Sequence, residues 1–192
     1  MSLSKPAIVT GIIVGFLVIV GLWLAGNYNS LVTASNAVDN SKAKIDTQLE
    51  RRYELIDNIV SSVEGSQAQE NEVFGKIAAA RKVGSSATSE SGKADANATI
   101  DQQIALLPRL QEQYPDLKSN DQVTRLIQEL QGTAGQVATA RDKYNDTVTN
   151  YNNNITRFPK SIFANVFGFG KKELFKASVE AQKNPQVKIE RP

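Results

Sequence analysis

An apolar run near the N-terminus constrains this chain more than any other feature. Ala7 to Ala25 are nineteen consecutive residues without a charge, and no proline follows them until Pro108. As a helix the run is about 28 Å long, close to the roughly 30 Å of a bilayer's hydrocarbon core. A cleaved signal peptide has a shorter apolar core, of about 7–15 residues. The run therefore predicts an uncleaved, single-pass anchor whose helix continues beyond the membrane.

Three small residues, Ala7, Gly11 and Gly15, recur every four positions within the run. At this spacing they stack on one face of the helix and would let a second helix approach closely. Glycine is also common in membrane helices for no specific reason, so transmembrane packing through these residues is one of two interpretations. Lys5 and Lys42 flank the run too thinly for the positive-inside rule to select an orientation.

The composition removes most catalytic chemistries. The chain has no cysteine and no histidine, which excludes thiol nucleophiles, imidazole bases and the usual zinc ligand sets. Its net charge of +2 is too small to indicate a nucleic-acid partner. No pair of carboxylates or lysines stands out by spacing as an acid and base. We therefore expect no enzyme activity, no cofactor, no metal site and no nucleic-acid partner.

Two long helical patterns follow the anchor, and each has apolar residues at alternating spacings of three and four, as in bundles and coiled coils. Each leg would be about 55 Å long. Asn120 or Ser119 offers an N-cap to the second pattern, and Pro159 ends it. The apolar seam positions are Leu31, Val38, Ile45, Leu49, Ile56, Ile59 and Val63 in the first pattern, and Val123, Ile127, Leu130, Ala134, Val137, Tyr144, Val148, Tyr151, Ile155 and Phe158 in the second.

Two shorter amphipathic pieces, 67–81 and 99–114, lie between the legs, and the small polar stretch 84–98 predicts a loop or a frayed helix. Pro108 should kink the second piece. Laid end to end, the pieces match the legs in length, which favours an all-α, up-down-up antiparallel bundle with an interrupted middle leg. If they fold against each other, a four-helix bundle results and the C-terminus returns to the membrane.

The segment 159–176 mixes aromatic and basic residues, as interfacial membrane segments do. Alternatively, its phenylalanines close the end of the bundle. In the up-down-up arrangement the segment lies far from the anchor, so it would touch a neighbouring or strongly curved membrane. The domains expected are an anchor (1–26), a helical bundle (27–158), this segment and a polar tail (177–192). The candidate residues for contact with membrane or another subunit are Phe163, Phe167, Phe169, Lys171, Lys172 and Phe175.

Arginines interrupt both seams, at Arg52 in the first leg and Arg141 in the second. With the adjacent Arg51, they predict a buried or half-buried ion pair that fixes helix register, because single polar seam positions can specify register. The candidate carboxylates are Glu112, Asp116 and Asp121.

A cluster of tyrosines and asparagines spans residues 144–154. It either forms a peptide- or glycan-binding surface or consists of seam tyrosines with solvated asparagines beside them.

Five linked motifs resemble the LemA family of bacterial membrane proteins in order and spacing. The resemblance runs from about Asn27 to Phe175. It implies an N-terminally anchored, extended helical bundle in the bacterial inner membrane, relatives linked to membrane remodelling and organelle formation, and no catalytic residues. The motifs are QLERRYELIDNIV (48–60), YPDLKSN (114–120), ARDKYND (140–146), Tyr151-Asn152 and Phe158-Pro159.

The function expected is that of a non-enzymatic, membrane-anchored helical scaffold that self-associates and shapes or bridges membranes. Its partners would be the lipid bilayer and further copies of the chain, as a homo-oligomer. The alternative is an envelope sensor or adaptor that binds a peptide or glycan partner through the bundle surface.

Overall fold

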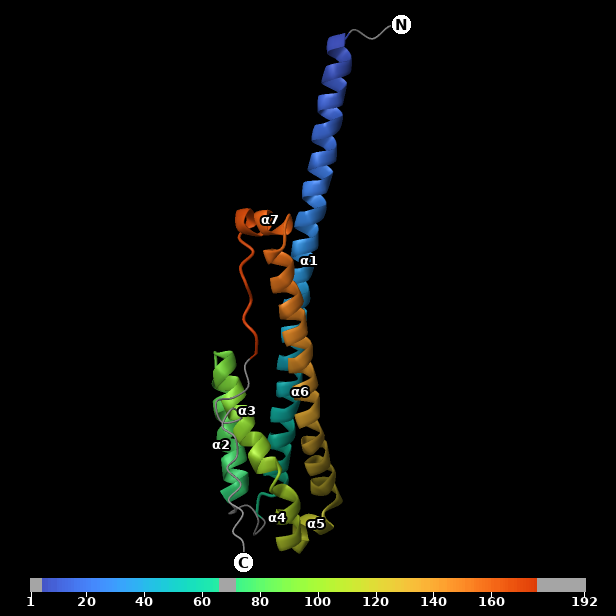
Figure 1. The fold of residues 1–192 in the computed structure, drawn as a ribbon. Coiled ribbons are helices and arrows are strands. Elements are labelled where there is room, and N and C mark those ends of the chain that lie inside the picture. Colours follow the sequence, from blue (N-terminus) through green and yellow to red (C-terminus); the bar gives the residue numbers. More distant parts are fainter. Residues whose placement is uncertain (1–4, 66–71, 176–192) are drawn as a thin grey trace, which may run out of the picture. The chain divides into compact units, whose positions relative to one another are not determined.

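The computed structural model describes residues 5–65 and 72–175, with side chains from residue 10 onward. Within these ranges the chain forms helices and no strands, so the predicted all-α class is confirmed. The helices, labelled in Figure 1, are α1 (Lys5–Ser62), α2 (Glu72–Ser86), α3 (Glu90–Ile104), α4 (Leu107–Gln113), α5 (Pro115–Ser119), α6 (Asp121–Thr156) and α7 (Lys160–Phe167).

The apolar run and the first leg belong to one helix, α1, of 58 residues. Gly26 does not interrupt it, which confirms the predicted continuity. Among the described residues, α1 is the one helix long and apolar enough to cross a membrane. None of its apolar window is buried inside the protein, whereas the core helix of a soluble protein would be mostly buried.

The chain divides into two compact units, and both α1 and α6 contribute to each of them. Of the described residues, the first unit, which we call the span unit, contains 5–42 and 145–174. The second, the bundle unit, contains 43–65, 72–144 and 175. The domain boundaries expected from the sequence stay a prediction, and the tail expected over 177–192 lies outside the described residues.

In the span unit, the end of α6 runs beside α1 and is followed by α7 (Figure 1). Seam residues of both long helices are buried here, including Leu31 and Val148, each at 0% exposure. The helix α7 ends at Gly168, whose φ of 75° lies in the left-handed region that glycine tolerates. The N–H of Phe169 donates to the carbonyl of Ala164 across this cap, at 2.8 Å. Phe158 was expected on the seam, but α6 ends at Thr156 and Phe158 is 82% exposed.

In the bundle unit, α2 and α3 pack side by side instead of end to end (Figure 1). This is the four-helix alternative, and the interrupted middle leg is wrong. The expected loop over 84–98 shrinks to residues 87–89, because Ser89 caps α3 by accepting a hydrogen bond from the Gly92 N–H at 3.1 Å. The chain breaks again before α4, with Pro108 in its first turn, as the predicted kink requires.

Both long helices bury nearly all of the seam positions that the sequence predicted, apart from Ala134, which is half-buried, and Phe158. In the bundle unit, Asn120 caps α6 as predicted, because its Oδ1 accepts from the N–H groups of Gln122 (3.0 Å) and Val123 (3.2 Å). Around these helices, the shorter ones bury small and aliphatic residues and one phenylalanine. The buried apolar residues of α2 to α5 are Phe74, Ile77, Ala80, Ala94, Ala96, Ile100, Ile104, Leu107, Leu110 and Leu117.

Candidate functional site

The apolar run of α1 is open along the described part of its small-residue face. A Cβ added at Gly11 or Gly15 would meet no other atom within 4 Å. The large apolar side chains around them, such as Phe16 and Leu17, are more than half exposed. The side chain of Ala7 lies outside the described residues. The geometry leaves this face free for lipid or for a second helix.

The helix α7 packs on α1 where the apolar run ends. The Trp23 and Phe163 rings lie edge to face, with centroids 5.3 Å apart, and the Tyr28 ring lies 5.0 Å from that of Phe167. At the start of α7, the Lys160 ammonium donates to Ser30 Oγ at 3.0 Å. The aromatic and basic segment therefore begins beside the apolar run. The expectation that it lies far from the run is wrong, because the pairing of α2 with α3 adds a reversal of chain direction.

The residues predicted for membrane or subunit contact divide into buried and exposed sets. Phe163 is buried, and so is Phe175, whose ring lies 4.6 Å from the Arg141 guanidinium. Phe167 is 53% exposed and Lys171 is exposed, whereas Phe169 is partly covered by Tyr28. Three further apolar residues of this stretch, which the sequence already places among its basic residues, are exposed at a common spacing of four. They are Phe158, Ile162 and Val166.

The stretch that follows α7 is held against α6 and α1. The Asn152 amide donates to the carbonyl of Lys172 and accepts from its N–H, both at 2.9 Å. The Tyr151 hydroxyl donates to the carbonyl of Gly170 at 3.0 Å. The Lys172 ammonium lies 3.4 Å from the Asp39 carboxylate. These contacts fix both the stretch and the end of α7.

The Tyr and Asn cluster does not present a flat aromatic surface. Tyr144 and Tyr151 are 8% and 2% exposed, which confirms their interpretation as seam residues. Burial raises the pKa of the Tyr151 hydroxyl above its ordinary value, and the nearby Asp39 carboxylate adds to the effect. A glycan or peptide would therefore find no tyrosine face here.

In the bundle unit, Arg52 is completely buried and joins three helices. Its Nε donates to Thr133 Oγ1 on α6 and its Nη1 to Asn97 Oδ1 on α3, each at 3.0 Å, and its Nη2 forms an ion pair with Asp101 on α3. The partner carboxylate is thus Asp101 and none of the three candidates Glu112, Asp116 and Asp121. The sequence did contain a signal for this set of partners. Asn97 is a polar residue at the same three-and-four spacing as the buried Ile100, Ile104 and Leu107.

The second seam arginine, Arg141, lies in the same unit without a comparable set of partners. Its Nε and Nη2 are buried and donate a hydrogen bond to no described residue. Burial lowers the pKa of its guanidinium, and the carboxylate of Asp101 opposes that effect. Arg51 is exposed and forms no ion pair with any described residue. The register role stays a prediction for all three arginines.

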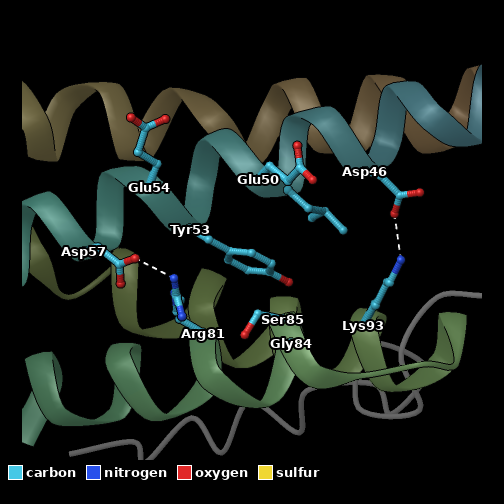
Figure 2. A pocket seen from close by; sticks show the side chains of 10 residues that line it. Asp46, Glu50, Tyr53, Glu54, Asp57, Arg81, Gly84, Ser85 and Lys93 are labelled. Atoms are coloured by element: carbon cyan, nitrogen blue, oxygen red, sulfur yellow. Dashed lines mark hydrogen bonds and ion pairs between the residues drawn. The ribbon is translucent and has the colours of Figure 1, made fainter.

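A groove of about 540 Å³ lies between α1 and the α2–α3 pair (Figure 2). Two of its ion pairs cross from α1 to the other helices, Asp46 with Lys93 at 2.7 Å and Asp57 with Arg81 at 2.5 Å. Between them on α1 stand two further acids that form no ion pair with a described residue. They are Glu50 and Glu54.

The fold defines a class: a helical bundle whose N-terminal helix is long and apolar enough to cross a membrane. Within that class the assignment comes from sequence comparison. The chain belongs to the LemA family, whose sequence profile matches residues 41–189.

The named relatives are distant in sequence, but their alignments cover most of the chain. Magnetosome protein MamQ 1 of Paramagnetospirillum magneticum is 25% identical over 174 residues, which is 77% of this chain and 64% of that protein. Magnetosome protein MamQ of Magnetospirillum gryphiswaldense is 24% identical over the same shares. Protein LemA of Metamycoplasma hominis is 25% identical over 92% of this chain and 84% of its own length. The chain thus spans about 64% of the length of the MamQ relatives.

Proposed function

We propose that this protein is a non-enzymatic scaffold, anchored in the bacterial inner membrane by α1, that self-associates and shapes the membrane. The observation that carries the proposal is the apolar run of α1, whose apolar window has no residue buried inside the protein and which continues without a break into the core of a helical bundle. Uncovered apolar surface of this length requires lipid or protein around it. A continuous helix also transmits any packing of the runs to the bundles that they carry.

Two further points support the scaffold. The open face at Gly11 and Gly15 would allow two copies of α1 to approach closely. The MamQ relatives are magnetosome proteins by name, in line with the role in organelle formation that the family resemblance implies. Bridging of two membranes loses its basis, since the aromatic and basic segment lies beside the apolar run.

The size of the full-length protein in mild detergent tests self-association. We expect an oligomer that the double substitution Gly11→Ile, Gly15→Ile converts to a monomer. Gly21→Ile is the matched control: it makes the same change six residues further on, on another side of the helix, where a Cβ also meets nothing within 4 Å. A monomeric wild-type protein, or an oligomer that survives the double substitution, would contradict packing through this face.

The groove of the bundle unit favours a second candidate function, an adaptor that binds a basic peptide. Glu50 and Glu54 line it without an ion pair among the described residues. An oligolysine peptide is a direct probe, measured by calorimetry on the full-length protein in detergent. Binding that weakens in Glu50→Gln, Glu54→Gln but not in Glu129→Gln, on exposed α6 surface, would support the adaptor. Unchanged binding in the double variant would count against it.

A further inference from the structure

We infer that α7 lies in the headgroup region of the membrane that α1 crosses, with its outer face against lipid acyl chains and exposed bases beside it on anionic headgroups. The inference deepens the proposed function and rests on its anchoring step. It names the occupant of one apolar helix face, the bilayer itself.

The outer face of α7 is uncovered and mainly apolar, with Asn165 as an exposed polar residue on it. Phe163 and Ala164, on the inner face, are 7% and 3% exposed. On the outer side, Val166 is 72% exposed and Ile162, one turn earlier, 54%. Phe158, four residues before Ile162, is 82% exposed. A short helix with one packed face and one contiguous apolar exposed face is typical of a segment that lies in the membrane interface.

The level of α7 along α1 coincides with the end of the apolar run. Its inner ring, Phe163, touches Trp23 in the last turn of the run, and Phe167 touches Tyr28, three residues beyond it. Three residues of helix advance only about 4.5 Å. Trp and Tyr concentrate where the hydrocarbon core meets water. If the run fills the hydrocarbon core, the outer face of α7 is therefore at the depth of the interface.

The orientation of α7 suits an in-plane helix. Figure 1 shows α7 lying crosswise to α1 within the span unit. Lys160 ties its start to Ser30, and the two Asn152 to Lys172 hydrogen bonds hold the stretch after its end. A helix that crosses a spanning helix in this way runs along the membrane surface. Its exposed side chains can then enter the leaflet without any change in the packing of Phe163.

The charge around α7 selects the lipid. Residues 157–175 contain four bases and one acid, Glu173. Arg157 and Lys171 are exposed, one on each side of α7, whereas Lys172 lies near Asp39. Exposed bases beside an interfacial apolar face attract anionic headgroups, and the attraction acts within a Debye length of about 10 Å. A second copy of the chain would bring the same excess of positive charge to this face and would be repelled.

Because the chain has no cysteine, a single label can report on this face in the full-length protein. Val166→Cys replaces an exposed side chain, and Asn150→Cys, exposed on α6 about 9 Å before its end at Thr156, is the matched control. Each variant carries an environment-sensitive fluorophore in vesicles of phosphatidylcholine and phosphatidylglycerol with brominated acyl chains. We expect quenching at position 166 to exceed that at 150 by at least about threefold, and to weaken when phosphatidylglycerol is omitted.

Equal quenching at positions 166 and 150 would overturn the inference. So would a label at 166 that is shielded from water but not quenched by brominated chains, because protein then covers the face. Quenching that is the same without phosphatidylglycerol would overturn the role of the bases. Cross-linking in the same vesicles reports self-association separately: an oligomer without quenching overturns only this inference, and quenching in a monomer overturns only the scaffold.

Discussion

Arg52 on α1 forms an ion pair with Asp101 on α3, and the two ends of this pair have very different environments. The Arg52 side chain is 0% exposed, whereas that of Asp101 is 44% exposed. A guanidinium is thus buried in the bundle with its countercharge at the water boundary. Its Nε and Nη1 donate to the neutral side chains of Thr133 and Asn97, so each of the three guanidinium nitrogens has a hydrogen-bond partner. We predict that this arrangement stabilises one register of α1 against α3 and α6, because any shift would leave the buried charge without its partners.

We predict that the two ends of this pair differ in their cost on substitution. Asp101→Asn should lower the free energy of unfolding by about 1–3 kcal/mol. The loss is limited because the carboxylate is half-exposed, so water can replace part of its interaction with Arg52. Arg52→Ala should cost about 3–5 kcal/mol, because it removes a buried side chain and leaves Thr133 and Asn97 without their donor. Guanidinium unfolding in detergent measures both. Glu72→Gln breaks the exposed Glu72 to Lys76 pair and should cause no measurable loss. An Asp101→Asn variant that matches or exceeds the loss in Arg52→Ala would contradict this difference.

A second prediction concerns Gly84, where α2 approaches both α1 and α3. A Cβ at this position would collide with the Tyr53 hydroxyl oxygen and would lie 3.2 Å from Ala96 Cβ. Tyr53 cannot yield freely, because its hydroxyl accepts a hydrogen bond from the buried Asn97 amide at 3.2 Å. We therefore expect Gly84→Ala to lower the free energy of unfolding by about 1–3 kcal/mol, despite the gain in helix propensity.

The matched control for Gly84 is Gly135→Ala on α6. Gly135 is exposed, and a Cβ there meets nothing within 4 Å. Alanine should thus raise stability by about 0.5–1 kcal/mol, through helix propensity alone. Thermal unfolding of both variants checks the sign. Stabilisation by Gly84→Ala would show that α2 and α3 do not pack as closely as the structure has them.

The long helices could be predicted from the sequence because an amphipathic helix places an apolar residue on its buried face at every turn. The alternating three and four spacing marked Leu31 to Val63 and Val123 to Ile155, and nearly all of these seam positions are buried. The start of α3 could not be predicted in this way. It buries Ala94, Ala96 and Asn97, whose small or polar side chains resemble a loop in sequence. Their burial follows from close packing against α2, which only the tertiary structure shows.

The candidate sites were only partly predictable, for a related reason. The aromatic and basic composition of 159–176 pointed to a membrane contact, but its location depends on whether α2 and α3 lie end to end or side by side. Helical periodicity does not distinguish these arrangements. Likewise, Arg52 stood out as a charged seam residue, but its partner Asp101 is 49 positions away in a piece predicted to be an end-to-end leg. Choosing among carboxylates required that packing.

The buried hydroxyl of Tyr151 predicts a loss of stability in alkali. Its pKa is raised above 10.0 in the folded chain, first by burial and then by Asp39. Below pH 10 both folded and unfolded chains keep the phenolic proton, so the contribution to stability is full. Above pH 10 the unfolded chain releases it first, and the free energy of unfolding falls by up to about 1.4 kcal/mol per pH unit until the folded pKa is reached.

Unfolding of the wild-type chain and Tyr151→Phe at pH 9 and pH 11 measures this contribution. The variant should be less stable at pH 9, since the hydrogen bond to the Gly170 carbonyl is lost. Its further decrease between pH 9 and pH 11 should be smaller than that of the wild type. Equal decreases in both chains would show that Tyr151 ionises as readily in the folded state as in the unfolded state.

The last prediction concerns the two hydrogen bonds between the Asn152 side chain and the backbone of Lys172. Asn152→Ala removes both, and at about 1 kcal/mol each the local opening of residues 169–174 should become roughly 5- to 30-fold more frequent. Hydrogen exchange of a peptide covering 169–175 in the full-length protein measures this opening. Asn153→Ala, at an exposed neighbouring position, is the matched control and should leave the exchange unchanged. The lost hydrogen bonds are local to the stretch that holds the end of α7. The 169–175 peptide should therefore exchange faster in the variant, while peptides from α2 and α3 do not. Faster exchange in both regions would instead indicate general destabilisation, and no change would show that Asn152 does not hold the stretch.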